Sequence, residues 1–174
     1  MDLHTFNNAP VESARLELTR CCGSAAWVER MLAQRPFADQ AALFSSAGTI
    51  WENLERSDWL EAFAHHPKIG DVDSLRARYA PVASHLASTA EWAAGEQKGV
   101  EDAPDAVLYA LANGNESYEE KFGYIFIVCA TGKSAAEMLT ILEGRLENNA
   151  ADELQIAMRE QEKITKLRLE KLLA

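Results

Sequence analysis

The chain has 174 residues, 48% of them hydrophobic, and this length and composition fit one compact domain covering residues 1–174. Its 17 basic and 27 acidic residues give a net charge of -10, and no block of Lys or Arg could neutralise phosphates, so nucleic acid and anionic membranes are not expected as partners. The longest apolar run is far below the ~20 residues of a membrane span, and residues 1–4 lack a signal-peptide pattern, so we expect a cytoplasmic protein.

Helix start and stop signals recur along the sequence. Asn7 to Pro10 combines a cap with an early proline, and Gly23 closes the helix that begins there. Caps, prolines and apolar periodicity predict further helices over residues 24–34, 39–54, 59–66, 85–97, 104–123, 134–146 and 151–173. Asn113-Gly114-Asn115 is expected to weaken the 104–123 helix, and residues 68–82 are expected to form a loop.

The segment Tyr124–Ala130 differs from the rest, because it is rich in β-branched and aromatic residues and stops at Thr131-Gly132. One strand cannot form a sheet, so the pattern predicts an all-α, multi-helix fold in which this segment is buried and either extended or a distorted helix. Its backbone groups would then be available to another partner, such as a ligand. Cys129 is better explained as a small buried hydrophobe than as a nucleophile. Together with Cys21 and Cys22 it forms neither a disulfide framework nor a zinc-ligand spacing, which favours a reducing compartment.

His66 lies where an amphipathic helix is expected to end. Apolar residues recur at helical spacing before it, Ser57 can cap the helix start, and Pro67 forces residue 66 out of the helical region. The negative end of the helix dipole favours the imidazolium by ~0.3–1 kcal/mol, which suits a proton donor near neutral pH. A purely structural C-terminal cap explains the same features, so both interpretations stay open. His65 and His66 diverge by ~100° on a helix, so the pair cannot face one ion and no metal site is predicted.

One cation on the 151–173 helix lies on the wrong face. Arg168 falls in the apolar sector of the helical wheel, whereas Arg159, Lys163 and Lys166 lie opposite. A guanidinium that faces the core needs an anionic partner, since arginine cannot deprotonate. An internal carboxylate and a substrate carboxylate are both compatible with this position.

The 85–97 helix carries a polar pair at its end. Gln97 projects onto the inward apolar stripe and Glu96 onto its edge, beside the small residue Ala93. This leaves room for a ligand next to the pair. A frayed helix end with solvated polar side chains is the alternative.

Four motifs occur in a characteristic order along the chain. They are His66–Asp71, Trp92–Val100, Glu120–Phe126 and Arg145–Asn148. In this order they resemble the 2-oxo-4-hydroxy-4-carboxy-5-ureidoimidazoline (OHCU) decarboxylases of urate degradation, over about residues 6–173. The resemblance implies an all-helical carbon–carbon lyase of purine catabolism that needs no cofactor and converts OHCU into S-(+)-allantoin and carbon dioxide.

The resemblance also implies roles for individual residues. His66 corresponds to the catalytic histidine and Glu96 to the catalytic glutamate, with Gln97 and Ala93 beside it in substrate binding. The substrate-binding arginine falls on Arg168, with Arg145 as the alternative. The backbone contacts of the family fall at Pro67, Phe126, Ile127, Val128, Cys129 and Ala130.

The chemistry of the reaction agrees with these assignments. Loss of carbon dioxide leaves a carbanion that can delocalise as an enolate, so the substrate supplies its own electron sink and neither metal nor organic cofactor is expected. His66 would act as general acid or base, Glu96 and Gln97 would hold the ureido and ring N–H groups, and Arg168 would anchor an oxygen. The alternative function is a non-catalytic helical module that binds a small anionic metabolite. The expected partner is a small molecule in both cases, and a homodimer is kept open as the assembly.

Overall fold

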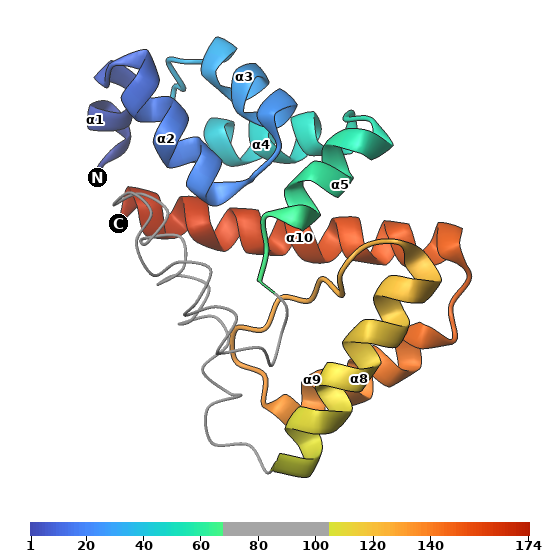
Figure 1. Cartoon of the computed structure of the whole chain (residues 1–174). Helices are drawn as coiled ribbons and strands as arrows, with labels where there is room; N and C mark the ends of the chain where they lie inside the picture. The colour runs from blue at the N-terminus through green and yellow to red at the C-terminus, as the bar shows by residue number, and fades with distance from the viewer. Residues whose placement is uncertain (68–104) are drawn as a thin grey trace. The chain divides into compact units, whose positions relative to one another are not determined.

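The structure is a computed structural model that describes residues 1–67 and 105–174, and within these ranges every regular element is a helix. The helices are α1 (Leu3–Asn8), α2 (Val11–Cys21), α3 (Ala25–Ala33), α4 (Gln40–Glu52), α5 (Arg56–Ala64), α8 (Asp105–Phe122), α9 (Ala135–Leu146) and α10 (Ala150–Leu173) (Figure 1). The prediction of an all-α fold is thus confirmed. In the described part of the chain, no helix is long and apolar enough to cross a membrane. The loop predicted over 68–82 and the helix predicted over 85–97 lie outside the described residues.

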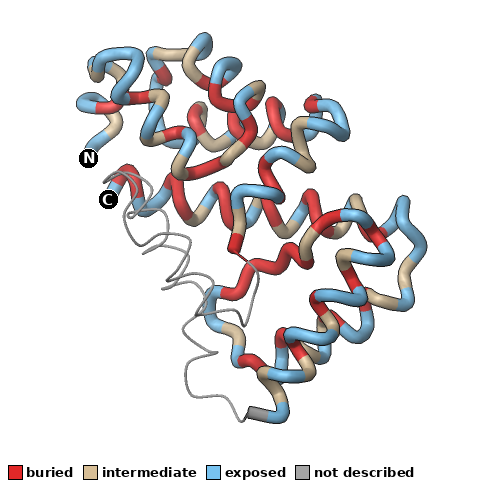
Figure 2. Tube along the Cα trace, viewed as in Figure 1, coloured by how far each residue is buried: buried red, intermediate tan, exposed pale blue. Residues whose placement is uncertain are grey.

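The chain divides into two compact units, each with its own buried core (Figure 2). The first unit comprises Met1–His65 with Glu162–Ala174, and Trp27 is among its largest fully buried side chains. The second unit comprises His66–Gln161, and Tyr118 is among its largest fully buried side chains. Apolar helix faces contribute to both cores, as amphipathic periodicity requires, and the second core also includes the non-helical residues 126–130. That the two units form a single domain stays a prediction.

Side-chain caps determine where several helices begin. Ser24 and Asp39 accept hydrogen bonds from backbone N–H groups in the first turns of α3 and α4. Ser134 and Glu137 form the predicted capping box at the start of α9. Helix α1 was not predicted from the sequence. It forms because Asp2 accepts a hydrogen bond from the N–H of Thr5 and so caps a short helix before the predicted start at residues 7–10.

Helix α5 begins earlier and ends earlier than the sequence predicts. A reciprocal pair of side-chain bonds between Glu55 and Asp58 caps its start, so Ser57 lies inside the first turn and is not the cap. The last helical residue is Ala64, and His65 is the C-cap. His66 is therefore not the last residue of the helix.

Helix α8 continues without a break through the Asn113-Gly114-Asn115 sequence, where a weakening was expected. The Asn115 amide donates to the carbonyl of Leu111 at 2.8 Å, so this polar side chain finds a partner within the helix. A Cβ atom on Gly114 would lie 2.7 Å from Cδ2 of Leu142 in α9. A larger residue here would force the Leu142 side chain to shift, so the close packing of α8 on α9 favours glycine despite its low helix propensity.

The segment between α8 and α9 has the predicted character. Residues 126–130 are all buried, and residues 125–130 run without helix, strand, turn or bend (Figures 1 and 2). Burial of the segment is therefore confirmed, and of the two predicted forms the distorted helix is wrong. Such a segment must satisfy its backbone groups by other means than regular secondary structure.

Candidate active site

His66 lies two residues beyond the end of α5, where the chain leaves the helix. Its side chain is half-buried and Pro67 after it is buried. The backbone N–H that closes the helix belongs to His65, which donates to the carbonyls of Ala62 and Phe63. The interpretation of His66 as a structural helix cap is therefore wrong, and the capping position belongs to its neighbour.

The predicted residues Ala93, Glu96 and Gln97 lie outside the described residues. Of the other predicted residues, His66, Pro67, residues 126–130 and Arg145 belong to the second unit, and Arg168 belongs to the first.

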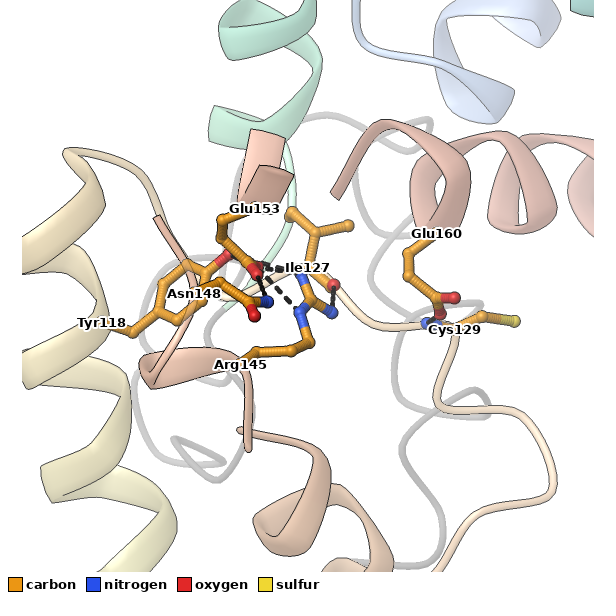
Figure 3. Close-up of polar contacts among 7 residues, drawn as sticks. All are labelled: Tyr118, Ile127, Cys129, Arg145, Asn148, Glu153 and Glu160. Atoms are coloured by element: carbon orange, nitrogen blue, oxygen red, sulfur yellow. Dashed lines mark hydrogen bonds and ion pairs between the residues drawn. The ribbon is translucent and has the colours of Figure 1, made fainter. Parts of the chain in front are cut away.

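Backbone groups of the buried segment are held by charged side chains from the helices that follow. The Cys129 N–H donates to Oε2 of Glu160 at 2.8 Å, and the Cys129 carbonyl accepts from Nζ of Lys133 at 2.6 Å. The Ile127 carbonyl accepts from Nη1 of Arg145 at 2.7 Å (Figure 3). The protein itself thus supplies a partner to each of these three groups, and binding of a ligand to this backbone stays a prediction.

Arg145 lies at the centre of a buried polar network (Figure 3). Its Nε and Nη2 atoms lie 2.8 and 2.6 Å from Oε1 of Glu153, which is 0% exposed. Asn148 donates to the other carboxylate oxygen at 2.7 Å, and the Tyr118 hydroxyl donates to Oε1. The guanidinium carbon also lies 4.7 Å from the centroid of the Phe126 ring. A buried charge is tolerated only with such compensation, so Arg145 acts as the cation of an internal ion pair.

The hydroxyl of Tyr118 is kept protonated by this environment. Burial raises the pKa of Tyr118, Arg145 opposes the rise, and the hydrogen bond to Glu153 adds to it. The hydroxyl therefore remains a donor to Glu153 at all physiological pH values. Sequence reasoning missed Glu153, although it stands four residues before the inward-facing Ala157, which is a signal that helical spacing could have used.

Arg168 occupies the inner face of α10, as the helical wheel predicts. The residue is 4% exposed, whereas Arg159, Lys163 and Lys166 are exposed on the opposite face. Its Nη1 atom donates to the carbonyl of Arg20 at 3.4 Å, which is a long hydrogen bond.

The three cysteines are buried and have free thiols. Burial raises the pKa of Cys21, and it raises the pKa of Cys22 to about 12. A nucleophilic cysteine needs a lowered pKa, so these two positions have the character of small core residues. Cys129 is 8% exposed, in agreement with the prediction that it is a buried hydrophobe.

The helices and the buried irregular segment define an all-α protein class. Residues 7–170 match the model of the OHCU decarboxylases, and the chain therefore belongs to the OHCU decarboxylase family. The resemblance noted from the motifs is confirmed.

Individual relatives support the family assignment. The uric acid degradation bifunctional protein TTL of Arabidopsis thaliana is 39% identical over 153 residues, which are 87% of this chain but 45% of the relative. The 2-oxo-4-hydroxy-4-carboxy-5-ureidoimidazoline decarboxylase of Amia calva is 33% identical over 143 residues, 80% of this chain and 75% of the relative. A crystal structure of an OHCU decarboxylase in the presence of (S)-allantoin is 38% identical, with a TM-score of 0.69 over 91% of this chain and 97% of that one. The chain thus spans about half the length of the Arabidopsis protein and most of the length of the other two.

Proposed function

We propose that this protein is an OHCU decarboxylase, which converts OHCU into (S)-allantoin and carbon dioxide. The observation that carries the proposal is the family match over residues 7–170, together with 38% identity to the structure of an OHCU decarboxylase with (S)-allantoin over nearly all of that chain. A cytoplasmic location is supported by the three free thiols and stays a prediction, as does a homodimer.

The proposed reaction needs positioning and proton transfer. The bond between the hydroxyl-bearing ring carbon and the carboxylate carbon breaks, and its electron pair moves toward the adjacent ring C=N group. The nitrogen of that group takes up a proton, the adjacent ring carbon gains a second proton and the hydroxyl loses one, which leaves the ring carbonyl of allantoin. One proton is consumed overall, and delivery of the carbon-bound proton from a single face produces a single enantiomer.

We assign the proton transfer to His66 as general acid or base. The residue follows the end of α5 by two positions, is half-buried and precedes the buried Pro67, which supports this assignment. Glu96 and Gln97 would hold the ureido and ring N–H groups, with Ala93 leaving room beside them. The assignments of Glu96, Gln97 and Ala93 rest on the sequence motifs alone.

We assign the substrate anchor to Arg168 in preference to Arg145. The guanidinium of Arg145 already contacts the buried Glu153 carboxylate through two nitrogens and the Ile127 carbonyl through a third. Drawing it toward a substrate would leave a fully buried carboxylate without its cation, which is costly. Arg168 is buried on the inner face of α10, and a planar guanidinium there suits bidentate binding of a carboxylate or carbonyl oxygen.

The proposal is tested by generating OHCU freshly from urate, adding the purified protein and following optical activity. Rapid formation of dextrorotatory allantoin is expected, against slow racemic decay in a sample without protein. Racemic decay at the uncatalysed rate would refute the activity. If the protein then still bound (S)-allantoin, the non-catalytic binding module would be the correct function.

A further inference from the structure

The backbone of Cys129 is held at both of its polar groups by half-buried side chains of opposite charge. Glu160 of α10 accepts from the N–H at 2.8 Å, and Lys133 donates to the carbonyl at 2.6 Å. Hydrogen bonds to charged partners are stronger than neutral ones by roughly a factor of two. Two such bonds on one residue fix both its position and its orientation.

The turn after the segment brings Lys133 back to it. Gly132 has a φ of 79°, a left-handed conformation that favours glycine. This turn lets the Lys133 N–H donate to the Ala130 carbonyl at 3.0 Å while its ammonium reaches the Cys129 carbonyl. One turn and one residue of α10 therefore both contribute to the geometry around Cys129.

The N–H groups on either side of Cys129 have no hydrogen-bond partner among the described residues. Val128 and Ala130 are both 6% exposed, and within residues 1–67 and 105–174 neither N–H has a hydrogen-bond partner. Buried N–H groups are normally paired, and an unpaired one costs about 1–3 kcal/mol. As far as the described residues go, they are thus available to an acceptor oxygen, such as a carbonyl or carboxylate oxygen of a ureidoimidazoline.

We propose that Glu160 and Lys133 are positioning residues, which hold the Cys129 backbone so that the N–H groups of Val128 and Ala130 are oriented for an oxygen of the substrate. The proposal rests on the proposed function. Neither side chain needs to touch the substrate, because each acts through the backbone that it binds. Preorganised donors of this kind lose little free energy on binding, since the protein has already ordered them.

The test compares Glu160→Ala and Lys133→Ala with Glu160→Gln and a matched control, Glu170→Ala, which removes an exposed carboxylate from the same helix. Glu160→Ala and Lys133→Ala are expected to lower kcat/KM for OHCU about 10- to 100-fold at a temperature where each variant is folded. Glu160→Gln keeps an acceptor oxygen and should stay within about fivefold of the wild type. Glu170→Ala should match the wild type.

A second measurement separates positioning from stability. In ¹⁵N NMR spectra, added (S)-allantoin should shift the amide signals of Val128 and Ala130 in the wild type, and Glu160→Ala should weaken this binding at least about tenfold. Two results would refute the positioning role while the activity of the wild type stands. In the first, both alanine variants behave like Glu170→Ala. In the second, Glu160→Gln is as impaired as Glu160→Ala. If the wild type does not turn over OHCU, the proposed function and the positioning role fall together.

Discussion

Replacement of Arg145 by methionine removes the cation from the buried network of the second unit. Glu153 is 0% exposed and Arg145 is 7% exposed, so solvent cannot take over the lost interaction. Breaking a buried ion pair by removing one partner costs about 3–5 kcal/mol, because the other charge is left without compensation. The methionine retains part of the packing against the Phe126 ring, which lies 4.7 Å from the guanidinium carbon. The free energy of unfolding should therefore fall by about 3–5 kcal/mol, and the melting temperature by about 6–20 °C for a chain of this size.

Urea unfolding followed by far-UV circular dichroism measures this change without screening the charges. Arg159→Met, on the exposed face of α10, serves as the control and should change the free energy of unfolding by less than about 0.5 kcal/mol. The double variant Arg145→Met/Glu153→Leu should recover part of the loss, since it leaves no unpaired charge. If Arg145→Met is no more destabilising than Arg159→Met, the network does not stabilise the fold, and Arg145 again becomes a candidate substrate anchor.

His66→Asn should lower kcat by about 10²- to 10⁴-fold. The circular dichroism spectrum should stay unchanged, because the residue lies outside helix α5. Near-full activity would contradict the general acid–base role. Arg168→Lys should lower kcat/KM far more than Arg159→Lys, since an ammonium cannot reproduce the planar, forked guanidinium. A lower melting temperature with unchanged kinetic constants would instead indicate a structural ion pair. The buried thiols of Cys21 and Cys22, with raised pKa values, should react with a thiol reagent only after unfolding in urea, and rapid modification of the native protein would contradict their burial.

Local patterns in the sequence predicted the features that one segment decides by itself. The capping box at Ser134 is confirmed because both of its partners lie within one helical turn. The two faces of α10, with Arg168 buried and Arg159 exposed, follow from a periodicity that every turn of the helix repeats. The buried, non-helical segment 124–130 follows from its composition. The motif order also identified the family, since it samples four separate positions between residues 66 and 148.

Tertiary structure decided which partners the buried polar groups have. The sequence offered two arginines and no means of choosing between an ion pair and a substrate contact for either one. Arg145 became the structural cation because α8 and α10 bring Tyr118 and Glu153 to it, from 27 residues before it and eight residues after it. The same holds for Gly114, whose low helix propensity is local but whose need to be small is set by Leu142 on another helix. Helical phase depends on neighbours within a few residues, whereas pairing of buried charges depends on which helices pack together, and that information is spread over the whole chain.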